Sequence, residues 1–198
     1  IYTYNGKQNV NCNHAIWDGS NYWIGDLYNG LNRSATNWSS ERFFIPGPYN
    51  NRCFQMSAAN ERIYVASGLV TGSAWNNESV ADGVYSFDQY DWGRYNGSSE
   101  SVIPSDSAFD FIYTAIDPND ESHALFCSFY GGLYEFQDDQ VINRYGSDNS
   151  PLSTSLVHAN QVKVSAAQFD KDGNIWAANS FATNPLIVIT PEGQAAYN

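Results

Sequence analysis

Acidic residues with the spacing of calcium ligands occur in the stretch FDKDGNIWAANS (Phe169–Ser180). Asp170, Asp172 and Asn174 stand at alternate positions, as the first ligands of a calcium loop do. An EF-hand also needs a Glu at the twelfth position of the loop, where this sequence has Phe181. Asp, Asn and Gly are also the common residues of tight turns. We therefore expect a hairpin turn here, with no metal site and no cofactor.

The residues best suited to ligand binding lie in an insertion, GLVTGSAWNNESVADG (Gly68–Gly83). A long polar loop with one Trp on a rigid scaffold is a common form of recognition surface. Trp75 could stack on a sugar ring, and Asn76, Asn77 and Glu78 could form hydrogen bonds with its hydroxyl groups. The alternative is a surface loop whose Trp folds back on the protein. These four residues are the candidate ligand-binding residues.

No catalytic signature is recognisable. His14, His123 and His158 are far apart in the sequence, and none lies in a known nucleophile motif. Phosphate-binding loops and dinucleotide fingerprints are missing too. Carboxylates are plentiful, but a glycosidase needs two of them about 5–9.5 Å apart in a cleft, and no two are singled out. We expect a protein that is not an enzyme. A carbohydrate-active enzyme is the alternative.

The charge of the chain argues against nucleic acid as a partner. The 198 residues carry a formal net charge of −12, which repels phosphate backbones. No apolar run approaches the roughly 20 residues of a membrane span. Aromatic residues make up 16% of the chain, a composition that suits strands. Because the sequence starts at Ile1 without a signal-peptide pattern, we expect a processed form or a piece of a longer chain.

Three cysteines are present, Cys12, Cys53 and Cys127. Their odd number and wide spacing match neither a disulfide framework nor a zinc signature. We expect small buried residues in strands. A Cys12–Cys53 bridge is the alternative, because the repeat described next gives both the same position in neighbouring units.

The turn and strand of FDKDGNIWAANS recur along the chain. Three weaker copies are WDGSNYWIGD (Trp17–Asp26), AANERIYVAS (Ala58–Ser67) and IDPNDESHALFCSF (Ile116–Phe129). The aromatic residues that mark the middle of each strand are Trp23, Tyr64, Phe126 and Trp176. Intervals of roughly 40 to 60 residues with variable insertions are typical of stacked four-stranded blades.

The repeat predicts an all-β chain made of β-propeller blades. Each unit has a first strand, a hairpin turn, the aromatic strand, a loop, a third strand, a tight turn and a fourth strand. IYTYNGKQNV at the start matches LYEFQDDQVI of a later unit, so the chain begins at a third strand. A closed ring needs about 4–8 blades, so we expect part of a larger ring. The expected division is a half blade at 1–11 and blades at 12–51, 52–110, 111–161 and 162–198.

Several motifs in this order resemble a known family. They are FIPGP (Phe44–Pro48), AIDPNDESHALFCSFYGGLYEF (Ala115–Phe136), NSPLSTS (Asn149–Ser155) and FDKDGNIWAANS followed by LIVITPEG. This series is similar to the Bacteroidetes two-component-regulator-type β-propellers and, among them, to PorZ-like proteins of the type IX secretion system.

The resemblance implies a location outside the cytoplasm, in the periplasm or at the outer cell surface. PorZ-like proteins act in secretion and in the attachment of cargo to anionic lipopolysaccharide. Related propellers are the oligosaccharide-binding sensor halves of hybrid two-component regulators. The implied function is a binding or scaffold module of PorZ-like type; the alternative is an oligosaccharide sensor. Lipopolysaccharide, an oligosaccharide and other blades or domains of a longer chain are the implied partners.

The open arc of blades has a further consequence. It exposes unpaired strand edges and the apolar faces that would otherwise pack between blades. Such surfaces tend to associate. We therefore expect the isolated chain to dimerise or to self-associate.

Overall fold

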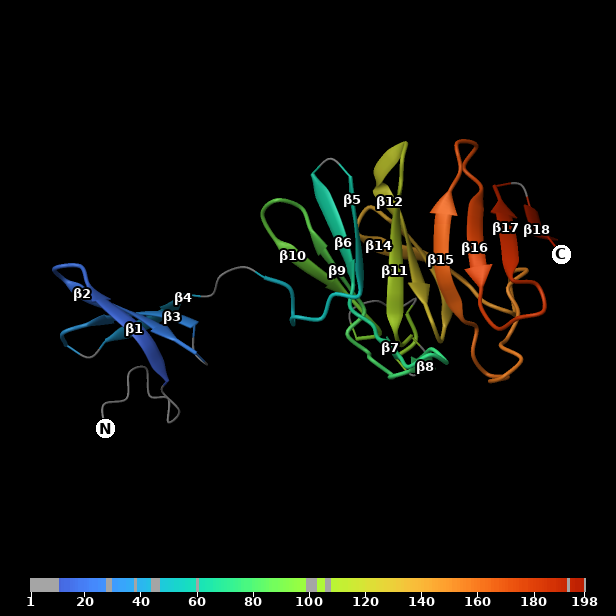
Figure 1. The fold of residues 1–198 in the computed structure, drawn as a ribbon. Helices are drawn as coiled ribbons and strands as arrows, with labels where there is room; N and C mark the ends of the chain where they lie inside the picture. Colours follow the sequence, from blue (N-terminus) through green and yellow to red (C-terminus); the bar gives the residue numbers. More distant parts are fainter. Residues whose placement is uncertain are drawn as a thin grey trace. The chain divides into compact units, whose positions relative to one another are not determined.

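In the described part of the chain the regular structure consists entirely of β-strands (Figure 1). The computed structural model describes residues 11–27, 30–37, 39–43, 47–59, 61–98, 103–105, 108–191 and, for the backbone only, 193–197. Most of the predicted half blade, residues 1–10, lies outside the described residues. Within the described ranges no helix is long and apolar enough to span a membrane.

The chain divides into two compact units, residues 1–46 and residues 47–198. The first unit contains one antiparallel sheet whose four strands pair in chain order. Its strands are β1 (Cys12–Trp17), β2 (Asn21–Asp26), β3 (Gly30–Ala35) and β4 (Ser40–Phe43). A four-stranded meander of this kind is the building unit of a propeller.

The second unit contains three more four-stranded antiparallel sheets. The strands of the first sheet are β5 (Gln55–Ala59), β6 (Arg62–Ala66), β9 (Val84–Phe87) and β10 (Trp92–Tyr95). Those of the second are β11 (Phe111–Asp117), β12 (Asp120–Ser128), β13 (Gly132–Gln137) and β14 (Gln140–Tyr145). Those of the third are β15 (Val164–Phe169), β16 (Ile175–Asn179), β17 (Leu186–Thr190) and β18 (Gly193–Tyr197).

The sheets of the second unit stack face to face around their first strands. β5 lies next to β11, and β11 lies next to β15 (Figure 1). Aromatic rings fill the first interface: the ring centroids of Tyr64 and Phe126 are 5.3 Å apart, and those of Tyr95 and Phe136 are 4.4 Å apart. A second apolar cluster, which includes Leu125, fills the interface between the β11–β14 and β15–β18 sheets. This stacking confirms the predicted propeller-type blades; no sheet closes on itself within the described part of the chain.

Asp170 forms the turn of its hairpin, as predicted. Its Oδ1 accepts hydrogen bonds from the backbone N–H groups of Asp172 (2.9 Å) and Asn174 (3.0 Å). Its Oδ2 accepts from the Asn174 side chain (2.8 Å) and from the indole N–H of Trp176 (2.9 Å). These donors lower the pKa of Asp170, the Asn174 side chain most. Both carboxylate oxygens are therefore engaged by the turn itself.

The first unit repeats this arrangement. Asp18 accepts from the backbone N–H groups of Ser20 and Asn21 and from the indole N–H of Trp23, the last at 2.6 Å. The Trp23 hydrogen bond is the largest cause that lowers the pKa of Asp18 to about 2. A turn Asp and a strand Trp whose N–H binds it are thus a paired feature of the repeat.

The expected equivalence of the four aromatic residues is wrong. Trp23 and Trp176 bind a turn Asp, whereas Tyr64 and Phe126 are fully buried between blades. In the β11–β14 blade it is His123 that binds the turn carboxylate of Asp117. His123 lies in β12, after the turn. Phe126 is an odd number of residues farther along the strand, so its side chain points to the opposite face.

The three cysteines differ in burial. Cys127 is buried in β12, as expected, and its burial raises the pKa of its thiol. Cys12 and Cys53 are both exposed, so the expected burial is not found for them, and the alternative Cys12–Cys53 bridge stays a prediction.

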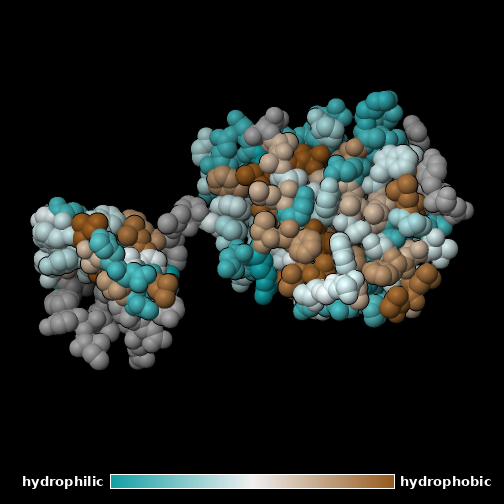
Figure 2. Space-filling model, viewed as in Figure 1, coloured by the Kyte–Doolittle hydropathy of each residue, from teal (hydrophilic) through white to brown (hydrophobic). Residues whose placement is uncertain are grey.

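Apolar side chains remain exposed on both units. Figure 2 shows apolar surface on the visible side of each. The exposed large apolar residues of the first unit are Ile16, Trp17, Tyr22, Leu27 and Leu31. Those of the second include Phe54, Met56, Ile142, Leu156, Val157 and Leu186.

Candidate functional site

Three loops that connect the second and third strands of their sheets meet at one end of the second unit. They are residues 67–83, 129–131 and 180–185. In Figure 1 this is the lower end, where β7 (Val70–Thr71) and β8 (Asn76–Asn77) lie. The hairpin turns that contain Asp-based hydrogen bonds are at the other end, because antiparallel strands place alternate connections at opposite ends.

The Gly68–Gly83 insertion is a folded hairpin. β7 and β8 pair antiparallel inside it, and the backbone N–H of Trp75 donates to the carbonyl of Gly72 (3.2 Å). Both of its ends are tightly packed. A Cβ at Gly68 would lie 2.4 Å from the carbonyl oxygen of Phe111, and a Cβ at Gly83 would lie 1.9 Å from a backbone oxygen. Only glycine fits at either end, so the hairpin starts and finishes in fixed positions.

One buried carboxylate anchors the hairpin to the next blade. Asp110, which is fully buried before β11, accepts the backbone N–H of Val80 at Oδ1 (2.9 Å). Its Oδ2 accepts the backbone N–H groups of Glu78 (3.1 Å) and Ser79 (2.9 Å) and the side-chain amide of Asn77 (3.1 Å). Hydrogen bonds to an ionised acceptor are roughly twice as strong as neutral ones. The hairpin is therefore held rigidly on the scaffold.

Trp75, Phe129 and Phe181 form an aromatic trough, one residue from each of the three loops. The Phe129 ring is fully buried, and its centroid is 5.7 Å from that of Trp75 and 6.3 Å from that of Phe181. Trp75 and Phe181 are each 45% exposed. Phe129 is thus the floor, and the other two rings are walls that reach into solvent.

Backbone strain accompanies the exposure of both walls. Trp75 has a φ of 51° and Phe181 a φ of 56°, which is the left-handed region that bulky residues avoid. Each such residue costs on the order of 1–3 kcal/mol and persists only where the surrounding structure enforces it. Strain of this kind concentrates at functional sites.

Lys163 lies beneath the trough. It is only 3% exposed, and its Nζ donates a hydrogen bond to Oδ1 of Asn77 (2.6 Å). Its Nζ is also 4.7 Å from the centroid of Phe129 and 5.6 Å from that of Phe181. Burial lowers the pKa of Lys163, because it disfavours the charged form, and the negative charge of Asp110 opposes this. An ammonium group is thus kept at the base of an aromatic site.

Two hollows border the walls of the trough. One, of about 310 Å³, is lined by Trp75, Phe129, Phe181 and the hydroxyl-bearing Ser165 and Ser180. The other has a volume of about 250 Å³. Its lining residues are Trp75, Phe181, Ser73, Ala74, Asn76, Val157, His158 and Lys163.

The four candidate residues divide into two pairs. Trp75 and Asn76 line a hollow and are accessible to a ligand. Asn77 binds Asp110, the carbonyl of Phe129 and Lys163, so its amide already serves the scaffold. The side chain of Glu78 accepts a hydrogen bond from the hydroxyl of Thr71. Trp75 fits both alternatives, because its ring folds back on Phe129 and is still exposed enough to stack on a ligand.

Sequence reasoning missed Phe181, Lys163 and His158 as site residues. They come from the blade at the C-terminal end and from the loop before it, far from Trp75 in the sequence. A comparison of the equivalent loops between second and third strands would have pointed to Phe181. No pattern in the sequence marks Lys163.

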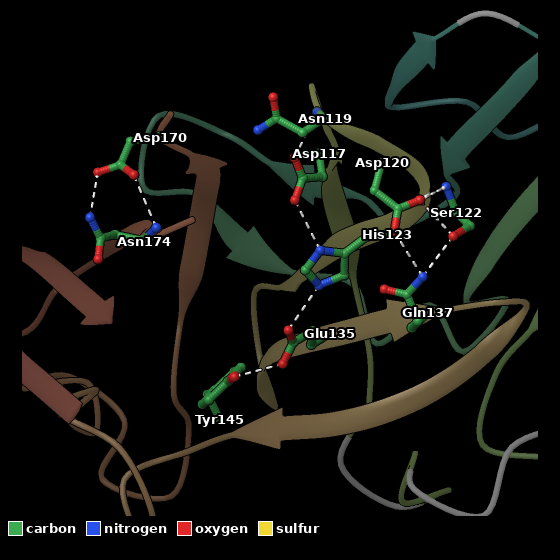
Figure 3. A network of polar contacts seen from close by, with 10 residues as sticks. All are labelled: Asp117, Asn119, Asp120, Ser122, His123, Glu135, Gln137, Tyr145, Asp170 and Asn174. Atoms are coloured by element: carbon green, nitrogen blue, oxygen red, sulfur yellow. Dashed lines mark hydrogen bonds and ion pairs between the residues drawn. The ribbon is translucent and has the colours of Figure 1, made fainter. Parts of the chain in front are cut away.

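A second polar cluster surrounds His123 (Figure 3). Its Nδ1 is 3.1 Å from Oδ2 of Asp117, and its Nε2 is 2.9 Å from Oε1 of Glu135. The hydroxyl of Tyr145 donates to the other oxygen of Glu135 (2.6 Å). The hydrogen bond to Glu135 is the largest cause that raises the pKa of His123, burial opposes it, and Asp117 adds to it. Two carboxylates thus favour an imidazolium that donates from both nitrogens.

The His123 cluster is structural rather than a ligand site. The imidazole packs on Phe169 of the next blade, with ring centroids 4.5 Å apart. The three charged side chains are mostly buried. The cluster therefore cross-links β12, β13 and the neighbouring blade, and takes the place that the Asp–Trp pair has in the β1–β4 and β15–β18 sheets.

Comparison with known proteins supports the type of fold and does not establish a specific function. No protein-family model matches the sequence, and no curated protein does. Among solved structures, the chain is similar to PorZ, a bacterial surface component of the type IX secretion system of Porphyromonas gingivalis. The TM-score is 0.68 and the identity 22%, over 91% of this chain and 25% of PorZ.

Two further structures show the same type of fold. The extracellular domain of a hybrid two-component system from B. thetaiotaomicron matches with a TM-score of 0.50 and 16% identity, over 100% of this chain and 25% of that one. The GH74 enzyme of Niastella koreensis matches with a TM-score of 0.51 and 12% identity, over 91% of this chain and 29% of that one. The chain thus spans about a quarter of the length of these proteins. Its blades have the propeller fold of PorZ and of the two-component-system domain.

Proposed function

We propose that the chain is a non-catalytic binding module that works outside the cytoplasm, as PorZ-like proteins do, and that it binds an oligosaccharide at the aromatic trough. One observation carries the proposal. Two large rings, Trp75 and Phe181, are held half exposed on strained backbone beside two hollows. Exposed rings that flank a hollow are suited to stacking on the apolar face of a sugar.

The chemistry around the rings fits hydroxyl-rich ligands. Asn76, Ser165 and Ser180 supply donors and acceptors, and Lys163 supplies further N–H donors. A few polar groups among aromatic walls are what fix the orientation of a ligand in a pocket. Lipopolysaccharide, whose glycan part has the same chemistry, is an equally suitable partner.

The lining of the hollows favours binding over hydrolysis. A glycosidase of the usual kind needs two carboxyl groups beside the bond that it cleaves. None of the described residues that line the two hollows is an Asp or a Glu. The fold similarity to a GH74 enzyme therefore does not extend to a carboxylate pair at this site.

The similarity to the two-component-system domain leads to a second candidate, an oligosaccharide sensor. Both candidates share the trough as binding site and differ in what the bound state controls. Binding alone does not separate them. Pull-down of secretion components by the chain would favour the PorZ-like role, whereas ligand-dependent dimerisation would favour the sensor.

Binding can be tested by calorimetry with a panel of oligosaccharides and purified lipopolysaccharides. Trp75→Ala should weaken binding at least about tenfold, because burying one large apolar side chain contributes about 1.5–3 kcal/mol and 1.4 kcal/mol corresponds to a factor of ten. Tyr90→Ala is the matched control, since Tyr90 is highly exposed in the turn between β9 and β10. Unchanged affinity of the Trp75→Ala variant would refute this site.

A further inference from the structure

The two hollows share the same aromatic walls. Trp75 and Phe181 line both of them. Each of these rings packs on Phe129, which lines the first hollow and is 4.7 Å, measured at its ring centroid, from Nζ of Lys163 in the second. The hollows are therefore neighbours on one surface and do not belong to separate parts of the molecule.

Each hollow by itself is small for a ligand site. Ligand pockets usually have volumes of about 300–1,000 Å³. The hollows measure about 310 and 250 Å³, at and below the lower limit of this range. A ligand that occupies both has a site of ordinary size, whereas a ligand in one leaves the other side of each ring exposed.

The chemistry of the hollows differs. The first has an aromatic floor and two hydroxyl groups, with Ser180 donating to Ser165 (2.8 Å). The second has Asn76, His158 and the ammonium group of Lys163. Two consecutive sugar units of one ligand would therefore meet different polar groups. This difference fixes the direction in which the ligand lies.

The backbone strain gives an independent reason to treat the hollows as a pair. Both Trp75 and Phe181 have positive φ, and they belong to loops of different blades. Left-handed backbone is costly for bulky side chains, and such strain concentrates at functional sites. Strain at both is explained if a ligand stacks along both rings.

We propose that the hollows are two adjacent subsites that hold consecutive rings of one linear oligosaccharide, so that a disaccharide is the smallest ligand bound with full contact. This inference rests on the proposed carbohydrate-binding function. It adds the length and the direction of the ligand. Binding energy comes from both subsites, so affinity rises steeply from one sugar ring to two and little beyond.

The test is a chain-length series measured by calorimetry. The probes are the mono-, di- and trisaccharides of β-1,4-linked glucose, mannose and galactose. The disaccharide of at least one series should bind at least tenfold more tightly than its monosaccharide, and the trisaccharide should bind less than about threefold more tightly still. Equal affinity for mono- and disaccharide would overturn the two-subsite inference and leave the proposed function standing. Absence of binding by every sugar would overturn both.

Variants that fill one hollow sharpen the test. Ala74→Phe fills the second hollow from an exposed turn, and Ser180→Phe fills the first; Val157→Trp and Ser165→Phe are second choices if either variant misfolds. Each substitution should reduce disaccharide affinity to the level of the monosaccharide. A variant that keeps the full disaccharide advantage would show that its hollow is not a subsite.

Discussion

Replacing Asp110 with Asn should destabilise the protein by about 2–4 kcal/mol and release the Gly68–Gly83 hairpin. The carboxylate accepts four N–H groups, three of them from the backbone of residues 78–80. An Asn can keep its oxygen at the Oδ2 position and retain three of these bonds. Its NH₂ group then faces the backbone N–H of Val80, two donors with no acceptor between them.

The magnitude follows from these contacts. A hydrogen bond to a charged group contributes about 1.5–3 kcal/mol, and an unsatisfied buried donor costs about 1–3 kcal/mol. Asn accepts the positive φ of Asp110 (51°) as readily as Asp does, so the backbone adds nothing to the loss. Asp138→Asn is the matched control, because Asp138 has a similar φ (50°) and is exposed.

Two measurements on the whole chain check this prediction. Urea denaturation gives the free energy of unfolding, and hydrogen exchange reports the opening of the hairpin. Asp110→Asn should lose protection at the amides of Glu78, Ser79 and Val80, whereas Asp138→Asn should match the wild type within about 0.5 kcal/mol. A variant at position 110 with wild-type stability and protection would refute the assignment of the anchor.

Three other predictions concern the scaffold. The raised pKa of His123 means that the folded state favours the imidazolium. The stability that the charged His123 contributes is fully present below the unfolded pKa near 6.5. It is lost as the pH rises through the folded pKa. The stability difference between wild type and His123→Gln, from denaturation at about pH 6 and about pH 9, should shrink with rising pH; a constant difference would contradict the assigned charge state. Gly83→Ala should lower the free energy of unfolding by at least about 2 kcal/mol, because Gly83 has a φ of +84° and a Cβ there would overlap the carbonyl oxygen of Tyr95. A change below about 0.5 kcal/mol would show that this backbone shifts freely. The isolated chain should self-associate through its exposed apolar surface and strand edges, so its mass by light scattering should rise with concentration, and a constant monomer mass would be the contrary result.

The repeat was readable from the sequence because it depends on local chemistry. Turn residues such as Asp170 and Asp18 bind donors two to six residues away, so their spacing survives in the sequence. Four-stranded blades followed from the order of turns and strands. The register of each strand was less certain, since a buried Phe126 and an exposed Trp176 look alike in a hydrophobic pattern.

The candidate site was only half predictable for a related reason. Trp75 was visible because it lies in an unusual insertion. Phe181 and Lys163 reach the same place only through the stacking of blades, which brings together loops that are far apart in sequence. The sequence did not show that the side chain of Asn77 binds Asp110, because a polar residue in a loop can bind the scaffold as well as a ligand.

The central claim is that sugars bind at the aromatic trough, and NMR of the Trp indole N–H groups tests it most directly. Titration with a binding oligosaccharide should shift the Trp75 signal. The signals of Trp23 and Trp176, whose indole N–H groups bind Asp18 and Asp170, should stay in place. Movement of these signals while that of Trp75 stays fixed would place the ligand elsewhere and contradict the account.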